Sequence, residues 1–431
     1  MKISFIGTGY VGLVSGVMMS HLGHEVICLD VDQNKIDQLK RFESPIYEPG
    51  LTEYIEKYGN SSRLQFIYGY DDSIADSDCL FVTVGTPPKE NGDADLSLIF
   101  QAVESASDHI NVDNCVIVLK STVPPGTCRQ VQEHMLKKGV SIKVVSNPEF
   151  LREGNAVQDF LEPDRIVIGA DSEYSFKVMR EVYKSLINQN IPFVETDLNT
   201  SELIKYASNT FLANKIAFIN EMADLCEVAG ANITSLSKGV GLDKRIGSDF
   251  LRAGPGFGGS CFPKDILALQ HFANTTNSEC LILNAVIEAN KSRSGNMIKK
   301  ISKALDGTIK NKKIAVLGLT YKAGTDDLRS SPAIDLINLL EKEGADIIAF
   351  DPKGMVHIEQ YFPNLTCAKS IFEAAKDSDA IIIATEWPEF AELDLMEVKK
   401  IVKQPNIIDL RNLLQPEEVI SLGFKYNSIG R

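Results

Sequence analysis

The sequence predicts an α/β fold in which two doubly wound parallel sheets are joined by a long central helix. Three observations lead to this prediction. Short apolar segments alternate with helical segments up to about residue 195, and the alternation resumes after about residue 310. Between them, the segment 199–229 contains no proline and no glycine. Strands that alternate with helices are typical of parallel sheets covered by helices on both faces.

Length and composition narrow the class of protein. A chain of 431 residues exceeds what one hydrophobic core organises, so several domains are expected. The 44 Lys and Arg residues against 58 Asp and Glu give a net charge of −14, which argues against nucleic acid and anionic membrane surfaces as partners. No segment has the ~18 uninterrupted apolar residues of a membrane-spanning helix.

Cysteine and histidine usage predicts the compartment and excludes a metal site. The eight cysteines are scattered without a CxxC pair, and we recognise no export signal at the N-terminus. We therefore expect reduced thiols and a cytoplasmic location. The six histidines form no HxH or HxxxH cluster, so no metal is predicted.

The N-terminal domain, residues 1–195, opens with a βαβ unit. A strand at Ile3–Ile6 runs through glycines into a helix, and a second strand from Glu25 ends at Asp30. Further strands are expected at Cys79–Val84, Val116–Lys120, Lys143–Ser146 and Arg165–Ile168.

The first turn carries a dinucleotide-binding pattern. Gly7, Gly9 and Gly12 form GxGxxG between a strand and a helix, where backbone amides can approach a pyrophosphate. Asp30 can accept hydrogen bonds from ribose hydroxyls and would repel a 2′-phosphate, which favours NAD over NADP. Lys35 can reach the adenosine side. The simpler alternative is a structural glycine turn beside a surface aspartate.

Two threonines follow later strands of the same sheet. Thr86 lies in TVGTPPK and Thr122 in KSTVPPGT. Since the carboxyl ends of such strands face the ligand crevice, both are cofactor candidates. The alternative is that they are turn residues beside prolines.

The central region, residues 196–310, is expected to be helical. Asn199 or Thr200 can cap the long helix, and Gly230 can end it. Its apolar residues occupy more than one stripe, so it is predicted to bridge domains or to form a dimerisation surface. Lys205 and Asn209, four residues apart, share one face of this helix. The alternative for this pair is a solvated strip.

The segment GFGGSCFPKD, residues 256–265, sets one cysteine among glycines. Its three glycines allow the backbone to approach a ligand closely. Lys264 would favour the thiolate of Cys261, which is the nucleophilic form, and Asp265 could orient a base or a water. The alternative is a glycine-rich turn before a helix that starts at Pro263. The other seven cysteines are interpreted as small buried apolar residues.

The C-terminal domain, residues 311–431, is predicted to have the same alternation of strands and helices as the N-terminal domain. Strands are expected at 313–319, at Ile347–Phe350 followed by Asp351, at Ala380–Ala384 and at Asn406–Asp409.

Seven motifs, taken in order, resemble those of the UDP-glucose dehydrogenase family, a branch of the nucleotide-sugar dehydrogenases. They are FIGTGYVGL, VGTPP, STVPPGT, NPEFLREG, KYASNTFLANKIAFINE, RIGSDFLRAGPGFGGSCFPKD and GLTYKAGTDDLRSSP. The resemblance covers essentially the whole chain. It implies two Rossmann-like domains around a dimerisation region, and oxidation of UDP-glucose to UDP-glucuronate by a homodimer with two NAD and one water.

The resemblance also implies residue roles. Cys261 attacks the aldehyde formed in the first oxidation, and the adduct is oxidised to a thioester. Lys205, Asn209 and Asp265 surround the reacting oxygen or an ordered water, and the water that hydrolyses the thioester is activated near Asp265 or Glu149. The acceptor of the first proton stays open among Thr122, Lys205 and a water.

The implied binding residues fall into two sets. The cofactor positions are Gly7, Gly9, Tyr10, Val11, Gly12, Asp30, Lys35, Thr86, Thr122, Glu153, Lys264 and Arg329. The substrate positions are Glu149, Phe150, Leu151, Arg152, Glu153, Lys205, Asn209, Arg245, Phe250, Leu251, Arg252, Ala253, Gly254, Phe257, Gly258 and Lys322, with Arg245 reaching across the dimer interface.

Three other functions are weighed against this one. A dehydrogenase for UDP-N-acetylmannosamine, UDP-N-acetylglucosamine or GDP-mannose would share most of these residues, but Arg245 and Phe262 favour the UDP-glucose branch. A two-electron β-hydroxy acid dehydrogenase shares the GxGxxG motif and the Lys–Asn spacing, but needs neither a nucleophilic cysteine nor a second Rossmann-like domain. A non-catalytic scaffold would not need the catalytic set.

Overall fold

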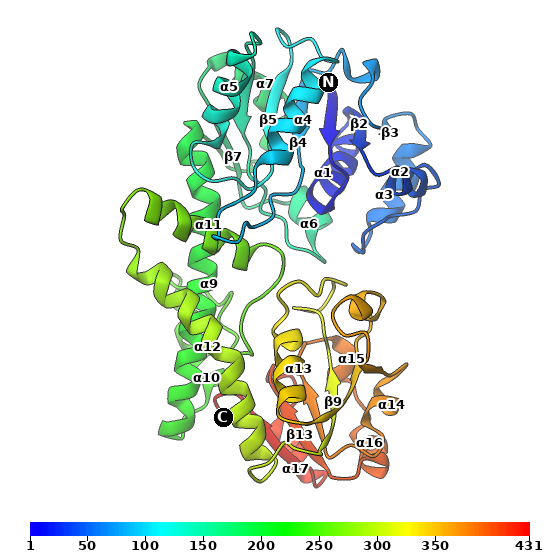
Figure 1. The fold of residues 1–431 in the computed structure, drawn as a ribbon, viewed down its shortest axis with the longest axis vertical. Helices are drawn as coiled ribbons and strands as arrows, with labels where there is room; N and C mark the ends of the chain where they lie inside the picture. The colour runs from blue at the N-terminus through cyan, green and yellow to red at the C-terminus, as the bar shows by residue number, and fades with distance from the viewer. The chain divides into compact units, whose positions relative to one another are not determined.

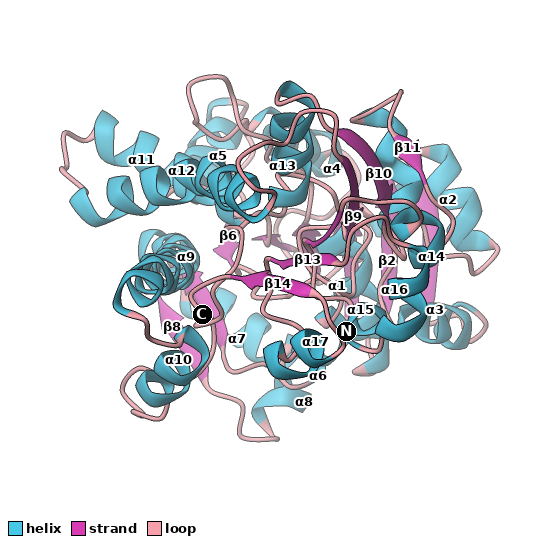
Figure 2. Ribbon diagram, turned by 90° about the horizontal axis from the view of Figure 1, so that it is seen from below, coloured by secondary structure: helices cyan, strands magenta, loops and turns pink.

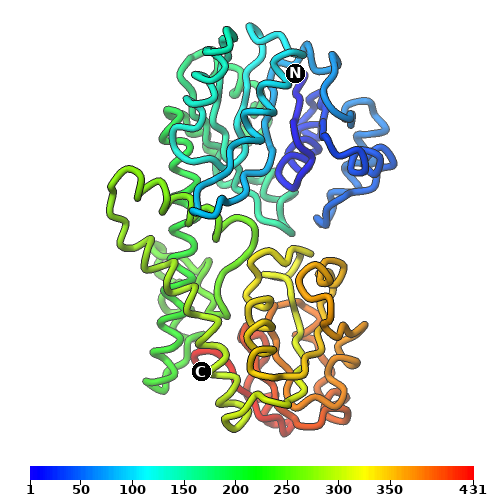
Figure 3. The backbone as a smooth tube through the Cα atoms, in the orientation of Figure 1, coloured from blue at the N-terminus to red at the C-terminus, as the bar shows by residue number.

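The computed structural model describes all 431 residues and divides into two compact units. Unit 1 contains residues 1–208 and 267–277, and unit 2 contains residues 209–266 and 278–431. Helices α9 (Leu198–Ala229) and α11 (Phe262–Thr275) each contribute residues to both units. The backbone of α9 is continuous (Figure 3, green).

Unit 1 is built on an eight-stranded sheet in the order β3-β2-β1-β4-β5-β6-β7-β8. Its strands are β1 (Lys2–Ile6), β2 (Glu25–Asp30), β3 (Leu64–Tyr68), β4 (Cys79–Val82), β5 (Val116–Leu119), β6 (Lys143–Ser146), β7 (Ile166–Ala170) and β8 (Phe193–Thr196). Its helices are α1 (Tyr10–His21), α2 (Gln33–Lys40), α3 (Leu51–Gly59), α4 (Ser97–Ser107), α5 (Thr127–Lys137), α6 (Ala156–Leu161), α7 (Glu173–Val182) and α8 (Lys184–Ile187), with a 3-10 turn at Asp72–Ile74.

The prediction of a wholly parallel first sheet is wrong at one place. Strands β6 and β7 are antiparallel, whereas β7 and β8 are parallel to each other. An antiparallel neighbour needs no crossover of the sheet. The connecting segment 147–165 therefore stays at the edge where β6 ends, and it carries the predicted residues of NPEFLREG.

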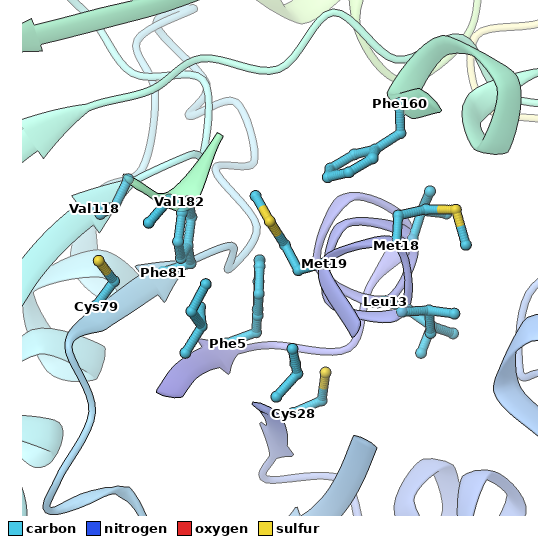
Figure 4. Packing of buried hydrophobic residues seen from close by; sticks show 14 of the residues in the cluster. Phe5, Leu13, Met18, Met19, Cys28, Cys79, Phe81, Val118, Phe160 and Val182 are labelled. Carbon is cyan, nitrogen blue, oxygen red and sulfur yellow. The ribbon is translucent and has the colours of Figure 1, made fainter. Parts of the chain in front are cut away.

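Helices cover both faces of this sheet (Figure 1). Alternate strand residues explain the two cores, since successive side chains point to opposite faces. Phe5 and Phe81 stack with ring centroids 4.7 Å apart on the face covered by α1. Figure 4 shows Met19 of α1 directed toward them. Their neighbours Ile6 and Val82 belong to the core under α4 and α5.

Unit 2 contains a six-stranded parallel sheet in the order β11-β10-β9-β12-β13-β14. Its strands are β9 (Lys313–Leu317), β10 (Asp346–Phe350), β11 (Thr366–Cys367), β12 (Ala380–Ile383), β13 (Asn406–Asp409) and β14 (Lys425–Ser428). Its helices are α10 (Ile233–Gly241), α12 (Leu281–Ala304), α13 (Pro332–Lys342), α14 (Ile371–Ala375), α15 (Pro388–Ala391), α16 (Leu395–Ile401) and α17 (Pro416–Ser421), with a 3-10 segment at Gly354–Gln360.

The faces of the second sheet are covered by different helices. Residues of α9, α12 and α13 form one core, and residues of α14, α16 and α17 form the other. Figure 2 shows α13 and α14 on opposite sides of β9 and β10. This confirms the predicted second doubly wound sheet.

The start of the long helix differs from the prediction. Asn199 and Thr200 lie inside α9, and the cap is Asp197, whose carboxylate accepts hydrogen bonds from the Thr200 N–H at 3.0 Å and the Thr200 hydroxyl at 2.6 Å. Gly230 follows the last helical residue with a φ of 66°, as a glycine that ends a helix does.

No helix combines the length and the apolar character that a membrane span needs. None of the eight cysteines is in a disulfide.

Candidate active site

The turn after β1 uses its glycines for different purposes. Gly7 has a φ of 95°, and a Cβ on Gly12 would lie 2.0 Å from the Gly7 carbonyl oxygen, so the turn closes tightly onto α1. By contrast, a Cβ on Gly9 would meet no atom within 4 Å. Protein packing therefore does not require glycine at position 9. The open space above the α1 N-terminus fits the close approach of a pyrophosphate.

Asp30 is buried at the end of β2 and is held by backbone and side-chain donors. Its Oδ2 accepts from the Thr8 N–H and the Thr8 hydroxyl, both at 2.7 Å, and its Oδ1 accepts from the Asp32 N–H at 3.0 Å. Burial opposes ionisation of Asp30, but these hydrogen bonds and the charge of Lys35 hold its pKa below the usual value. The result is a fixed anion where a ribose would bind and a 2′-phosphate would be repelled.

Replacing Asp30 with alanine should raise the KM for NAD at least about tenfold and leave the KM for the second substrate unchanged. The variant loses the charged acceptor that is predicted to bind the cofactor ribose and not the second substrate. A matched control exists in unit 2, where Asp351 ends β10 and accepts hydrogen bonds from Leu319 and Thr320 in the same manner. Asp351→Ala should leave the KM for NAD unaltered. An unchanged KM for NAD in folded Asp30→Ala would reject the ribose assignment.

The segments after β4 and β5 converge near the glycine turn. The Thr86 hydroxyl donates to the Thr122 carbonyl at 3.1 Å, and the Thr83 hydroxyl donates to the Gly7 carbonyl at 2.9 Å. The strand order reverses between β1 and β4. Such a switch point is where doubly wound sheets bind ligands, so both predicted threonines lie at the expected edge.

Lys205 and Glu149 form a buried ion pair within unit 1. The Lys205 Nζ lies 2.8 Å from the Glu149 Oε1, and the two side chains are only 5% and 4% exposed. Burial opposes ionisation of Glu149, but the Lys205 charge, its hydrogen bond and the Leu151 N–H hold the pKa of Glu149 below its usual value. A carboxylate at this distance favours the charged form of Lys205.

Sequence reasoning missed three residues behind this pair. The Lys120 Nζ lies 3.2 Å from the Asn147 Oδ1 and 3.4 Å from the Tyr183 hydroxyl. Burial lowers the pKa of Lys120 to about 8, opposed by the Glu149 carboxylate and helped by the Lys205 charge. A lysine directly after the apolar strand β5 was the available signal, because such a position is seldom exposed.

Unit 2 brings together four predicted residues, Cys261 among them. The Asn209 Nδ2 donates to the Asp265 Oδ2 at 2.6 Å, and the Lys264 Nζ donates to the Asp265 Oδ1 at 2.5 Å. Cys261 directly precedes α11, and its carbonyl accepts from the Asp265 N–H at 2.9 Å. Its partly exposed Sγ lies 3.5 Å from the Ser260 hydroxyl. The positive end of the helix dipole favours a thiolate at this position.

The glycines before the cysteine are required by neighbouring protein atoms. A Cβ on Gly256 would lie 2.9 Å from the Asn290 Oδ1, and one on Gly258 would lie 2.1 Å from the Ser330 carbonyl oxygen. A Cβ on Gly259 would lie 2.8 Å from the Tyr321 ring. These glycines allow a close approach to protein groups, and the predicted approach to a ligand stays a prediction.

Several predicted binding residues lie at the surface and pair locally. Arg245, with a side chain 89% exposed, pairs with Asp243 at 2.6 Å, and Arg329 pairs with Asp327 at 2.7 Å. Lys322 has its Nζ 5.7 Å from the centre of the Tyr321 ring. These contacts neither assign nor remove a role in binding.

Comparison with protein families covers most of the chain. Residues 1–187 match the NAD binding domain of the UDP-glucose/GDP-mannose dehydrogenase family, residues 199–292 match its central domain, and residues 315–416 match its UDP binding domain.

Individual relatives agree with this over their full length. The chain is 54% identical to a UDP-glucose 6-dehydrogenase of Rickettsia felis, covering 100% of this chain and 96% of the relative, and 47% identical to one of Rhizobium meliloti, covering 100% of both. Among solved structures, a UDP-glucose dehydrogenase from Pyrobaculum islandicum is 35% identical with a TM-score of 0.91, covering 99% and 96% of the two chains. A UDP-D-ManNAc dehydrogenase from Pyrococcus horikoshii is 25% identical with a TM-score of 0.88, covering 100% and 99%.

Proposed function

Because the chain belongs to the UDP-glucose/GDP-mannose dehydrogenase family, we propose that it oxidises UDP-glucose to UDP-glucuronate with NAD as the electron acceptor. The observation that carries this proposal is the full-length match, at 54% identity, to proteins named UDP-glucose 6-dehydrogenase. The three family domains also support the division into a cofactor domain, 1–195, a central helical domain, 196–310, and a UDP-sugar domain, 311–431.

Two polar residues of α9, Lys205 and Asn209, suit the first oxidation. Bound NAD supplies the chemistry of hydride acceptance from C6 of the sugar. Lys205 is held charged by Glu149, so it is suited to stabilising the oxygen at C6 as that oxygen loses its proton. Asn209 is a neutral donor one helical turn further along α9. The ion pair with Glu149 argues against Lys205 as the base, which favours Thr122 or a water for the first proton.

Cys261 carries the second oxidation. Its Sγ forms a bond to the aldehyde carbon, and the carbonyl oxygen takes a proton, which gives a thiohemiacetal. Loss of a hydride and the hydroxyl proton converts this adduct to a thioester. Water then attacks the acyl carbon, the C–S bond breaks, and the carboxylate product leaves with the thiolate restored. We assign the water proton to Asp265, whose carboxylate is held by Asn209 and Lys264.

The stoichiometry of cofactor reduction tests this function. We expect two NADH for each UDP-glucose consumed, measured by absorbance together with quantification of UDP-glucuronate. One NADH per sugar would indicate a two-electron dehydrogenase instead. Turnover of UDP-N-acetylmannosamine or GDP-mannose without turnover of UDP-glucose would move the chain to another branch of the family. A relative named for UDP-D-ManNAc shares the fold, so this panel of substrates is the relevant comparison.

A homodimer is part of the proposal. Phe211, Phe218 and Leu225 recur every seven residues along α9 and are 65%, 45% and 59% exposed. A stripe of large apolar side chains at this spacing suits a helix–helix contact between two copies. Arg245, exposed in one chain, is then available to a partner's substrate. Sedimentation at micromolar concentration tests this, and a monomer would reject it.

We also propose a cytoplasmic location. Eight cysteines without a disulfide and a catalytic thiol suit a reducing compartment that supplies NAD. Fractionation of cells with an antibody to the chain checks the location.

A further inference from the structure

Three side chains of unit 2, two of them buried, form hydrogen bonds with the backbone of the loop at 250–258. The Asn220 Oδ1 accepts from the Gly254 N–H at 2.8 Å, and the Arg293 Nε donates to the Gly254 carbonyl at 3.0 Å. The Asn290 Oδ1 accepts from the Phe257 N–H at 2.9 Å, and its Nδ2 donates to the Phe257 carbonyl at 3.0 Å. Both polar groups of two loop residues are thus bonded to side chains.

These side chains come from helices α9 and α12, which lie side by side (Figures 1 and 2). Asn290 and Arg293 are three residues apart on α12, so they share one face. Asn220 lies on α9, as does Asp224, whose carboxylate oxygens are both 2.8 Å from the Arg293 Nη1. Arg293 is only 3% exposed. An ion pair with one deeply buried partner adds little to the stability of a protein, because burying the charge costs free energy. The hydrogen bond from Arg293 to the loop therefore says more about the role of Arg293 than the ion pair does.

The loop holds backbone conformations that need such support. Phe250 has a φ of 61°, which is uncommon for a bulky residue, and Gly256 has a φ of 122° directly against Asn290. A strained backbone conformation persists only where the surrounding structure holds it in place. The loop is also tied to the residue after the thiol, because the Phe257 and Phe262 ring centroids are 6.0 Å apart.

We propose that Asn220, Asn290 and Arg293 are positioning residues, which we call the loop brace, and that they hold residues 250–258 in the shape that binds the UDP-sugar. This inference rests on the proposed function, which assigns the loop to the substrate. Asn220 and Arg293 are buried and Asn290 is half-buried, and all three contact the loop through its backbone. Without the brace, binding must itself order the loop, and the cost appears as weaker substrate affinity.

The test compares two brace variants with a control on the same helix. Arg293→Lys keeps a cation for Asp224 but loses the planar guanidinium that reaches both Asp224 and Gly254. Asn290→Ser breaks no ion pair. The binding constants can be measured on this variant if Arg293→Lys does not fold. The control is Lys300→Met. Lys300 lies seven residues further along α12, pairs with Glu227 of α9 and donates to the Ser428 carbonyl at 2.9 Å, away from the loop.

The readouts are the KM values for UDP-glucose and NAD, the Kd for UDP by calorimetry, and the Tm. We expect the brace variants to raise the KM for UDP-glucose and the Kd for UDP about tenfold or more, with the KM for NAD unchanged and a Tm no lower than that of Lys300→Met. A KM for UDP-glucose within about twofold of wild type would overturn the brace, as would equal losses in the control. A wild-type protein that neither binds UDP nor reduces NAD with UDP-glucose would overturn the proposed function itself.

Discussion

Cys261→Ser is expected to lower kcat for NADH formation by about a thousandfold or more while leaving NAD and UDP-glucose binding near wild type. A serine hydroxyl adds poorly to the aldehyde at neutral pH, and an ester, once formed, is hydrolysed slowly. Steady turnover should therefore stop after an initial burst of two NADH per site, because formation of the ester consumes both oxidations. Stopped-flow absorbance measures the burst, and mass spectrometry of the quenched variant should find the sugar acid attached at position 261.

Cys280 is a matched control for this experiment. It is partly exposed and directly precedes a helix, α12, as Cys261 precedes α11. Cys261 differs from Cys280 in the polar groups that follow it. Asp265, four residues on, accepts hydrogen bonds from Lys264 and Asn209. Cys280→Ser should keep wild-type kcat. Steady-state turnover of Cys261→Ser near the wild-type rate would exclude a covalent role for this thiol.

The interior strands of both sheets could be predicted, and the edge strands could not. The missed strands β3, β8, β11 and β14 are the outermost strands of the two sheets. A strand buried on both faces is a continuous apolar run, as in Val116–Leu119. An edge strand is half solvated, as in Phe193–Thr196, and its sequence resembles that of a loop.

The site residues that lie within motifs could be named from sequence, but their partners could not. Gly7, Asp30 and Cys261 are marked by spacing and by the strand or turn beside them. No motif or spacing identifies Asn290 and Arg293, because they contact a loop more than thirty residues away in sequence. The same holds for Asp197, which caps α9 although Asn199 and Thr200 are equally good capping types. Buried polar residues acquire a role only from the groups that the fold brings to them.

Lys205→Met is the second substitution with a large expected effect. Its first expected consequence is a lower free energy of unfolding. The variant leaves Glu149 buried without its main counter-charge, which should cost about 3 kcal/mol of unfolding free energy at pH 7. In the wild type the pKa of Glu149 is depressed, so its contribution to stability is present above its unfolded pKa of about 4.5 and is lost as the pH falls below that value. In the variant, burial opposes ionisation of Glu149, and only the Leu151 N–H and the Lys120 charge offset it. Denaturation from pH 4 to 8 should therefore show the largest loss at the upper end.

A double variant separates this structural cost from catalysis. Lys205→Met with Glu149→Gln removes both charges, so much of the unfolding free energy should return. Catalysis should not return, because no cation is left to stabilise the oxygen at C6, and kcat should stay at least about a hundredfold below wild type in both variants. Recovery of kcat together with stability would mean that the ion pair serves only the fold. A kcat that stays low while the double variant regains its stability would mean that the Lys205–Glu149 pair acts in the reaction and not only in the fold.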